Sequence, residues 1–196
     1  MIMKPLFAAA KQSSNRKIVY AEGEDERVLR AVQVVVDEKL ARPVLVGRPT
    51  VIERRIERYG LRIKAGADFD LINPEWDERY RAYWQEYFSL TERKGVSQEY
   101  AKIEMRRRLT LIAAMCVRRG EADGMICGTF GTHQTHLHYI EQVIGRRPGV
   151  NHFYAMNVLL LPRRTVFICD TYVNFDPTAE QIAEMTVLAA EEIRRF

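Results

Sequence analysis

The first sixty residues alternate between two hydrophobic patterns. Short apolar runs occupy residues 17–22 and 43–47, and each is followed by a segment, residues 25–40 and 49–59, whose apolar positions lie three or four residues apart. Short continuous runs are typical of buried strands, and the wider spacing is typical of amphipathic helices. Strand, helix, strand and helix joined by short links indicate right-handed crossovers that build a parallel sheet. The pattern therefore predicts an α/β fold.

The middle of the chain is predicted to be helical. Residues 74–90 contain six aromatic side chains at mixed spacing, so these side chains cannot all lie on one face of a helix. This favours a helix held between two layers of the fold, or between subunits, over an aromatic cage for a ligand. A second long helix is expected over residues 97–117, and Gly120 is expected to end it.

A glycine loop follows the next apolar run. Residues 122–128 predict a short buried strand, and a helix is expected from His133 to Ile144, with glycines at positions 128 and 131 in the loop between them. A strand, a glycine loop and a helix N-terminus present backbone N–H groups and the positive end of the helix dipole to an anion. The G-x-x-G spacing matches neither the dinucleotide-binding fingerprint nor the P-loop, so it does not indicate a nucleotide cofactor.

The end of the chain follows a different pattern. Two apolar runs flank a turn at residues 162–164, which predicts a β-hairpin, and a helix capped by Asp176 or Thr178 is expected after it. The change in composition ahead of the hairpin predicts a second domain, so we divide the chain into residues 1–148 and 149–196. The last helix would ordinarily lead into another strand, which indicates a fragment of a longer protein.

Composition excludes several classes of protein. The 196 residues are 47% hydrophobic and 29% charged, as in soluble globular proteins. The N-terminal segment is too short and polar for a signal peptide or a membrane span, so we expect a cytoplasmic protein that does not bind membranes. Three cysteines, an odd number without close spacing and in apolar surroundings, predict buried free thiols.

The net charge of +4 is carried largely by pairs of adjacent arginines. Acidic residues are interleaved with them, which favours solvated helix faces and turns. A small ligand that bears phosphate is the alternative explanation. Nucleic acid is not expected as a partner, because the sequence lacks a lysine-rich arm and any known recognition motif.

Three histidines, His133, His136 and His138, follow the glycine loop. On a helix the first two share a face, whereas His136 and His138 point about 200° apart, so a regular helix cannot direct all three at one metal ion. No cysteine or acidic residue stands at a matching offset, and the pattern therefore favours surface or loop histidines over a metal site. A nucleophile triad is not indicated either, because no serine lies in an elbow motif and the cysteines lie in apolar surroundings.

Five runs of sequence carry a resemblance to a known family: KIVYAEGEDERVLRAVQ, ARPVLVGRP, EADGMICG, RRPGVNHFYAMNVLLLP and VNFDPTAEQIAEM. They resemble the N-terminal part of the phosphate acetyl/butyryl transferase family. More narrowly, they resemble the C-terminal phosphotransacetylase-like domain of the large bacterial NADP-dependent malic enzymes. The resemblance implies a three-layer, parallel-sheet fold of the isocitrate dehydrogenase-like type, incomplete in this chain, with the beginning of a second α/β domain that contains the hairpin. It also implies acyl-CoA bound between the two domains, and a homodimer or higher oligomer.

The same resemblance implies two replacements in the glycine loop and the helix after it. Transferases of the family typically carry Ser-Gly-Ala-x-His-Thr-Thr-Ala-Asp-Thr-Val-Arg-Pro there. Counted back from Pro148, the family histidine falls on Gly131 and the family arginine on His138. An arginine is planar, permanently charged and offers five donors, and a histidine supplies neither the permanent charge nor the five donors.

A third replacement lies upstream. The transferases tend to show Arg-x-x-Lys-Gly, and this chain has Thr91 in the arginine position, ahead of Lys94 and Gly95. Arg93 stands two positions away and is the candidate substitute. Further catalytic residues of the family would lie beyond residue 196. We therefore assign no catalytic residue to this segment.

Ligand binding without catalysis is the resulting expectation. Acyl transfer to phosphate needs cationic stabilisation, which the missing guanidinium no longer provides, whereas the backbone N–H groups of the loop remain. We expect an acyl-CoA-responsive regulatory and oligomerisation domain of an NADP-dependent malic enzyme, with acetyl-CoA as effector. The malic-enzyme domain of the same chain would bind NADP and Mg or Mn, and this segment would bind no metal. The expected ligand-binding residues are Gly128, Thr129, Phe130, Gly131, Thr132, His133, His138 and Arg93.

Two other functions stay open from the sequence. One is an active phosphate acetyltransferase, which would convert acetyl-CoA and phosphate into acetyl phosphate and CoA. The other is a scaffold that only oligomerises its parent protein through the aromatic helix at residues 75–90.

Overall fold

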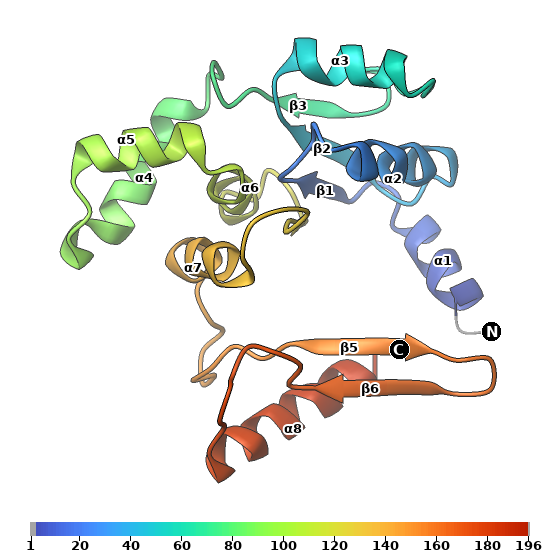
Figure 1. The fold of residues 1–196 in the computed structure, drawn as a ribbon, viewed down its shortest axis with the longest axis vertical. Helices are drawn as coiled ribbons and strands as arrows, with labels where there is room; N and C mark the ends of the chain where they lie inside the picture. Colours follow the sequence, from blue (N-terminus) through green and yellow to red (C-terminus); the bar gives the residue numbers. More distant parts are fainter. Residues whose placement is uncertain (1–2, 196) are drawn as a thin grey trace. The chain divides into compact units, whose positions relative to one another are not determined.

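A four-stranded parallel sheet is the centre of the computed structural model, which describes residues 3–195 (Figure 1). The strand order is β3-β2-β1-β4, and Val19 of β1 lies opposite Val44 of β2 and Met125 of β4. The predicted α/β fold is thereby confirmed. The strands are β1 (Lys17–Tyr20), β2 (Arg42–Val46), β3 (Asp70–Ile72) and β4 (Gly124–Ile126).

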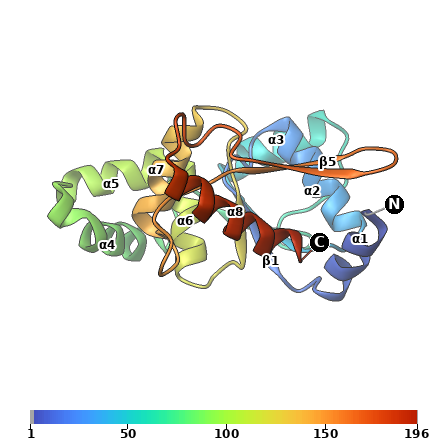
Figure 2. The same ribbon diagram turned by 90° about the horizontal axis from the view of Figure 1, so that it is seen from below.

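Helices cover both faces of the sheet and complete three layers (Figures 1 and 2). Successive strand residues point to opposite faces, so Val19 and Tyr20 of β1 belong to different cores. Val19 packs with α4 to α7, and Tyr20 packs with α2 and α3. The helices of this part are α1 (Met3–Gln12), α2 (Glu26–Asp37), α3 (Pro49–Arg58), α4 (Tyr80–Thr91), α5 (Gln98–Arg107), α6 (Leu109–Arg118) and α7 (His133–Val143), with a 3-10 turn η1 (Glu92–Lys94).

The aromatic segment begins its helix later than predicted. Residues 74–79 are not helical, and Trp76 is 82% exposed. The Asn73 side chain accepts a hydrogen bond from the Glu75 N–H, and the Asp77 side chain accepts one from the Arg79 N–H. Such local side-chain contacts compete with a helix. From Tyr80 onward the helix packs against α5, α6 and α7, which accounts for its mixed aromatic spacing.

The single helix predicted over residues 97–117 is wrong, because the chain forms two helices that break at Arg108. This residue is extended, with φ −105° and ψ 96°. After the break, every residue of α6 from 110 to 116 is buried, whereas α5 buries only three of its residues. No glycine or proline marks the break, so it arises from packing and not from local propensity.

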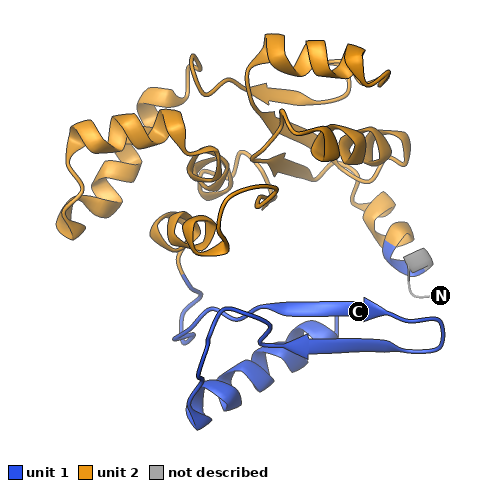
Figure 3. Ribbon diagram, in the orientation of Figure 1, with its two compact units in different colours: residues 1–6, 146–196 blue, residues 7–145 orange. Residues whose placement is uncertain are grey.

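The chain divides into two compact units (Figure 3). We call Phe7–Gly145, drawn in orange and keyed as unit 2, the first unit. We call the chain from Arg146 onward together with residues up to Leu6, drawn in blue and keyed as unit 1, the second unit. The predicted hairpin is present, because β5 (Met156–Leu160) pairs antiparallel with β6 (Thr165–Cys169). Helix α8 (Ala179–Ile193) follows. Thr178, and not Asp176, caps this helix in a capping box with Gln181.

Helix α8 has apolar residues at core spacing, but none of its side chains is fully buried. Val187 is 61% exposed and Ile182 is 47% exposed. One helix and a two-stranded hairpin offer too little surface to enclose an apolar face. The second unit, as described, therefore contributes far less burial than the first, whose Leu29 is completely enclosed.

This contrast gives a stability test. Leu29→Ala removes a buried side chain and should lower the free energy of unfolding by about 2–5 kcal/mol. Val187→Ala should change it by less than about 0.5 kcal/mol, because that side chain is exposed. Urea unfolding followed by the fluorescence of buried Trp84 measures both variants. Equal losses for the two would contradict the burial difference.

Candidate functional site

A cleft of ≈ 750 Å³ lies at the carboxyl ends of the strands in the first unit. Ligands in open α/β sheets bind at this edge where the strand order reverses, and here the order reverses between β1 and β4. The volume is in the range of small-molecule sites. The lining residues are Glu22, Glu24, Asp25, Arg48, Arg55, Pro74, Glu75, Arg106, Arg107, Arg108, Leu109, Thr110, Phe130, Gly131, Thr132, Thr135, His136 and Tyr139.

The glycine loop is tied to the segment that follows β1. The Gly128 N–H donates a hydrogen bond to Oε1 of Glu22 at 3.2 Å, and the Glu22 residue is only 3% exposed. The Thr129 carbonyl accepts a hydrogen bond from Arg27 at 2.8 Å, and the Thr129 hydroxyl is buried. Gly128 and Thr129 therefore anchor the loop, and the residues that follow them reach the cleft.

His136 holds the second half of this loop. Its Nε2 lies 2.8 Å from the Phe130 carbonyl oxygen, and its Nδ1 lies 2.7 Å from Oγ1 of Thr110. Because a carbonyl only accepts, Nε2 carries a hydrogen, and in that tautomer of the imidazole Nδ1 accepts from the Thr110 hydroxyl. Gly131 has φ +95°, and a Cβ atom there would lie 3.2 Å from Nε2 of His136. Glycine at this position thus admits the imidazole.

The acidic residues at the β1 side of the cleft are mostly paired with arginines. Arg48 binds both carboxylate oxygens of Glu24 at 2.9 Å, and its hydrogen bonds lower the pKa of that carboxyl group. Arg55 donates to the Glu24 backbone carbonyl. Arg27 binds the Asp25 carboxylate at 3.0 Å. Glu22 is the exception, because it forms no ion pair within residues 3–195.

The three adjacent arginines at the end of α5 differ in their contacts. Arg106 donates to the Glu75 carbonyl and lies 4.0 Å from the centre of the Tyr80 ring. Arg108 donates to the Glu104 carboxylate at 3.1 Å. Arg107 is exposed and has no hydrogen bond or ion pair to any of the described residues. Arg107 is therefore the cation of this cleft that is available to a ligand.

A buried carboxylate supports the side of the cleft formed by α5 and α7. Glu104 is 4% exposed and accepts hydrogen bonds from Arg108 and from the hydroxyl of Tyr139. Burial, and then this carboxylate, raise the pKa of Tyr139. Burial, and then the charge of Glu104, raise the pKa of Tyr87 to about 12. These phenols stay neutral near pH 7 and act as hydrogen-bond donors.

The cysteines are free thiols, as predicted, but the predicted burial is right for Cys116 alone. Cys116 is buried, and Cys127 and Cys169 are half-buried. Burial, and then the negative charge of Glu22, raise the pKa of Cys127 to about 11. A thiol protonated at neutral pH is a poor nucleophile, so the position of Cys127 beside the loop does not make it a catalytic group.

The structure separates the residues expected to bind ligand into two groups. Phe130, Gly131 and Thr132 line the cleft, whereas Gly128 and Thr129 anchor the loop without lining it. Three further residues also lie outside the lining, namely His133 at the start of α7, His138 and Arg93 in η1. The centroids of the His138 and Tyr139 rings lie 5.3 Å apart in a T-shaped arrangement.

Sequence reasoning missed Glu22, Arg107 and His136 as cleft residues. Glu22 follows a predicted strand, and Arg107 lies in a run of three arginines, but neither position carries a motif. Among the described residues, no three potential metal-ligating side chains gather at one place. None of the described helices has the length and apolar character needed to cross a membrane.

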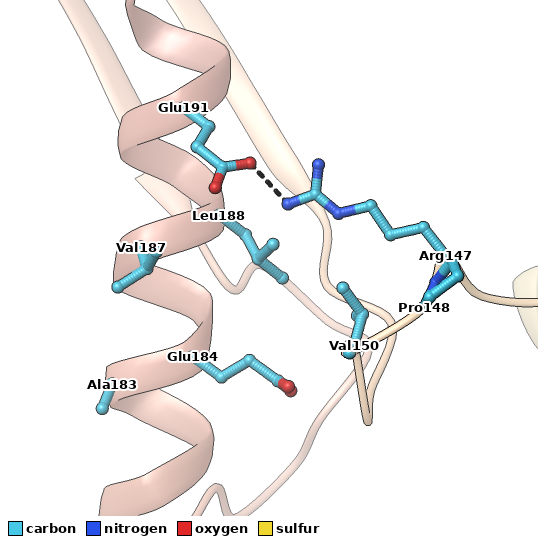
Figure 4. A pocket seen from close by; sticks show the side chains of 9 residues that line it. Arg147, Pro148, Val150, Ala183, Glu184, Val187, Leu188 and Glu191 are labelled. Atoms are coloured by element: carbon cyan, nitrogen blue, oxygen red, sulfur yellow. Dashed lines mark hydrogen bonds and ion pairs between the residues drawn. The ribbon is translucent and has the colours of Figure 1, made fainter.

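A second hollow, of ≈ 530 Å³, lies between α8 and residues 147–150 in the other unit (Figure 4). Arg147 forms an ion pair with Glu191 across it. The Glu184 carboxylate accepts hydrogen bonds from the Asn151 N–H and the Tyr154 hydroxyl, which lower its pKa to about 2. These contacts within the unit satisfy the charges of the hollow, and we assign it a structural role.

The protein is a three-layer α/β protein with a parallel sheet, a cleft at the carboxyl ends of the strands, and a following unit that contains a hairpin. The chain is a member of the phosphate acetyl/butaryl transferase family, whose model matches residues 1–196. It is 52% identical to the NAD-dependent malic enzyme of Rhizobium meliloti (strain 1021) and 50% identical to the NADP-dependent malic enzyme of Salmonella typhimurium (strain LT2).

The two malic enzymes are much longer than this chain. Each alignment covers 100% of the chain but only 25% or 26% of the relative, so the chain spans about a quarter of their length. Among solved structures, the EutD phosphotransacetylase from Staphylococcus aureus is similar, with a TM-score of 0.83 and 26% identity. That match covers 96% of this chain and 57% of the other.

The contact between Gly131 and His136 can be tested with two substitutions. Gly128 and Gly131 both have positive φ, so alanine is strained at either position, by about 1–2 kcal/mol. Gly131→Ala should cost more, because its Cβ meets His136, whereas a Cβ at Gly128 meets nothing within 4 Å. Unfolding free energies and the nitrogen NMR shifts of His136 measure the difference. An unmoved His136 signal in Gly131→Ala would contradict the contact.

Proposed function

We propose that this chain is an acyl-CoA-responsive regulatory domain of a malic enzyme and has no phosphate acetyltransferase activity of its own. The observation that carries the proposal is the cleft at the carboxyl edge of the sheet, which has a free cation at Arg107 but no free cationic or basic group on its glycine loop. Acetyl-CoA is the proposed effector. The identity to malic enzymes supports the proposed parent.

Binding is supported by the chemistry of the cleft. A guanidinium that is not engaged within the protein is suited to a phosphate oxygen, because its donors form short, charge-assisted hydrogen bonds. Phe130, Gly131 and Thr132 line the same cleft, and their N–H groups have no protein partner in the described residues. An acyl-CoA offers phosphates and amide carbonyls to these donors.

The absence of catalysis is supported by the contacts of His136. Its Nε2–H is directed at the Phe130 carbonyl, and its Nδ1 accepts from Thr110, so neither ring nitrogen is free to move a proton to or from a ligand. His138, which stands where the family arginine is expected, does not line the cleft. Acyl transfer would therefore lack both a base and a cation at the glycine loop and α7, and the available cation, Arg107, belongs to α5.

Assembly and cofactors follow from the proposed parent. The malic-enzyme domain would lie in the same chain and would bind NADP and Mg or Mn for oxidative decarboxylation of malate to pyruvate. This segment would form a homodimer or a higher oligomer and transmit the state of the cleft to that domain. Allosteric coupling between two such sites is typically 1–3 kcal/mol, about 5- to 150-fold in affinity.

Titration of the full-length protein with acetyl-CoA tests the proposal. The apparent affinity for malate, followed through NADPH absorbance, should change about fivefold or more on saturation with acetyl-CoA. Pantetheine, which lacks the phosphates, is the matched control ligand and should have a much weaker effect. Malate kinetics that are identical with and without acetyl-CoA would contradict the regulatory role.

The competing function is phosphate acetyltransferase activity, and the structural similarity to the EutD phosphotransacetylase supports it. The same full-length preparation, supplied with acetyl-CoA and phosphate, should form no acetyl phosphate above the rate without protein. The hydroxamate assay detects the product. Formation above background would show that the site retains transfer chemistry.

A further inference from the structure

We propose that the cleft recognises the two ends of its ligand with opposite charges: the Glu22 carboxylate accepts a hydrogen bond from an N–H group of the ligand, and Arg107 binds a phosphate group. The inference rests on the proposed function, since it concerns the same cleft. Acyl-CoA fits this pairing, because its pantetheine arm carries amide N–H groups and its nucleotide end carries phosphates.

Glu22 is a buried acidic residue whose side chain accepts only one hydrogen bond from the described residues. The residue is 3% exposed and lines the cleft, and its one hydrogen bond comes from the Gly128 N–H at 3.2 Å. That donor is neutral and occupies only Oε1. Buried carboxylates are ordinarily paired with a cation or bonded at both oxygens, because desolvation of the charge is costly. None of the described residues donates a hydrogen bond to Oε2, and Glu22 lines the cleft, so this oxygen is available to a donor of a ligand.

Arg27 does not fill this role, because its guanidinium is already engaged with other groups. It binds the carboxylate of Asp25 at 3.0 Å and the carbonyl of Thr129 at 2.8 Å. The cleft arginines Arg48 and Arg55 are likewise directed at Glu24. Among the described residues, the Glu22 side chain thus has no ion-pair partner beside the loop.

Arg107 presents the reverse situation. Its two neighbours are engaged, Arg106 with the Glu75 carbonyl and Arg108 with Glu104, whereas Arg107 has no partner among the described residues. Glu22 and Arg107 line the same cleft without forming an ion pair with each other. The Glu22 carboxylate and the Arg107 guanidinium, neither of which has an ion-pair partner, line one cleft. They therefore fit a ligand with a hydrogen-bond donor at one end and an anion at the other.

The charge of Glu22 also decides where the phosphate binds. The sequence pointed to the glycine loop, but an anion placed at Gly128 would meet the carboxylate that already accepts from its N–H. Like charges in a partly desolvated site repel strongly. The phosphate is therefore assigned to Arg107 and the neutral N–H group to Glu22.

Calorimetric titration of the full-length protein with acetyl-CoA, pantetheine and inorganic phosphate tests both ends. Arg107→Gln should weaken acetyl-CoA and phosphate about tenfold or more and leave pantetheine unchanged. Glu22→Gln should weaken pantetheine and acetyl-CoA severalfold but strengthen phosphate, because a nearby negative charge is removed. Arg54→Gln is the matched control: Arg54 is an exposed arginine of α3 outside the cleft and should change none of the three.

The opposite signs for Glu22→Gln separate recognition from loss of structure, since a damaged cleft would weaken every ligand. If Glu22→Gln does not fold, Glu22→Asp keeps the charge but shortens its reach, and it should weaken pantetheine while leaving phosphate unchanged. Pantetheine affinity that is insensitive to Glu22, or phosphate affinity that is insensitive to Arg107, would overturn the inference. Ligand effects as expected with unaltered malate kinetics would overturn only the regulatory proposal.

Discussion

The hydrogen bond from the Gly128 N–H to the Glu22 carboxylate is the constraint on which the site depends. It joins the chain after β1 to the chain after β4, at the point where the strand order reverses. Because the bond holds the first residue of the loop, the next residues turn into the cleft, and His136 then clasps the Phe130 carbonyl. A buried charge accordingly fixes a loop that would otherwise be free at its two glycines.

Much of the fold is readable from the sequence, because its hydrophobic periods agree with the tertiary packing. Alternate residues of β1 serve different cores, and α2 and α3 carry the three-to-four spacing that one face of the sheet requires. The break at Arg108 and the late start of α4 at Tyr80 were not readable. The first depends on burial of α6 in its entirety, and the second depends on the side-chain contacts of Asn73 and Asp77.

The site could be predicted less well from the sequence, because the role of each residue depends on its hydrogen-bond or ion-pair partner in the folded chain. Arg106, Arg107 and Arg108 are chemically identical in the sequence, and only their neighbours make one of them available. His136 differs from His138 by two positions, yet the first bridges α6 and the loop while the second lies outside the cleft. The glycines did locate the loop, because the positive φ angles at positions 128 and 131 favour glycine, which the sequence shows directly.

The contacts of α7 are the structural basis on which the proposed regulation would depend. His136 bonds to Thr110 near its start, Tyr139 bonds to Glu104 at its middle, and the Gln142 amide accepts from the Tyr87 hydroxyl near its end. The helix is thus fastened along its length to α6, α5 and α4 in turn. A ligand that displaced the loop would act on the contact between His136 and Phe130, and through it on a helix that is bonded to three others. Coupling requires an element with two arrangements that the ligand binds unequally, and the proposed regulation would assign that part to this group of helices.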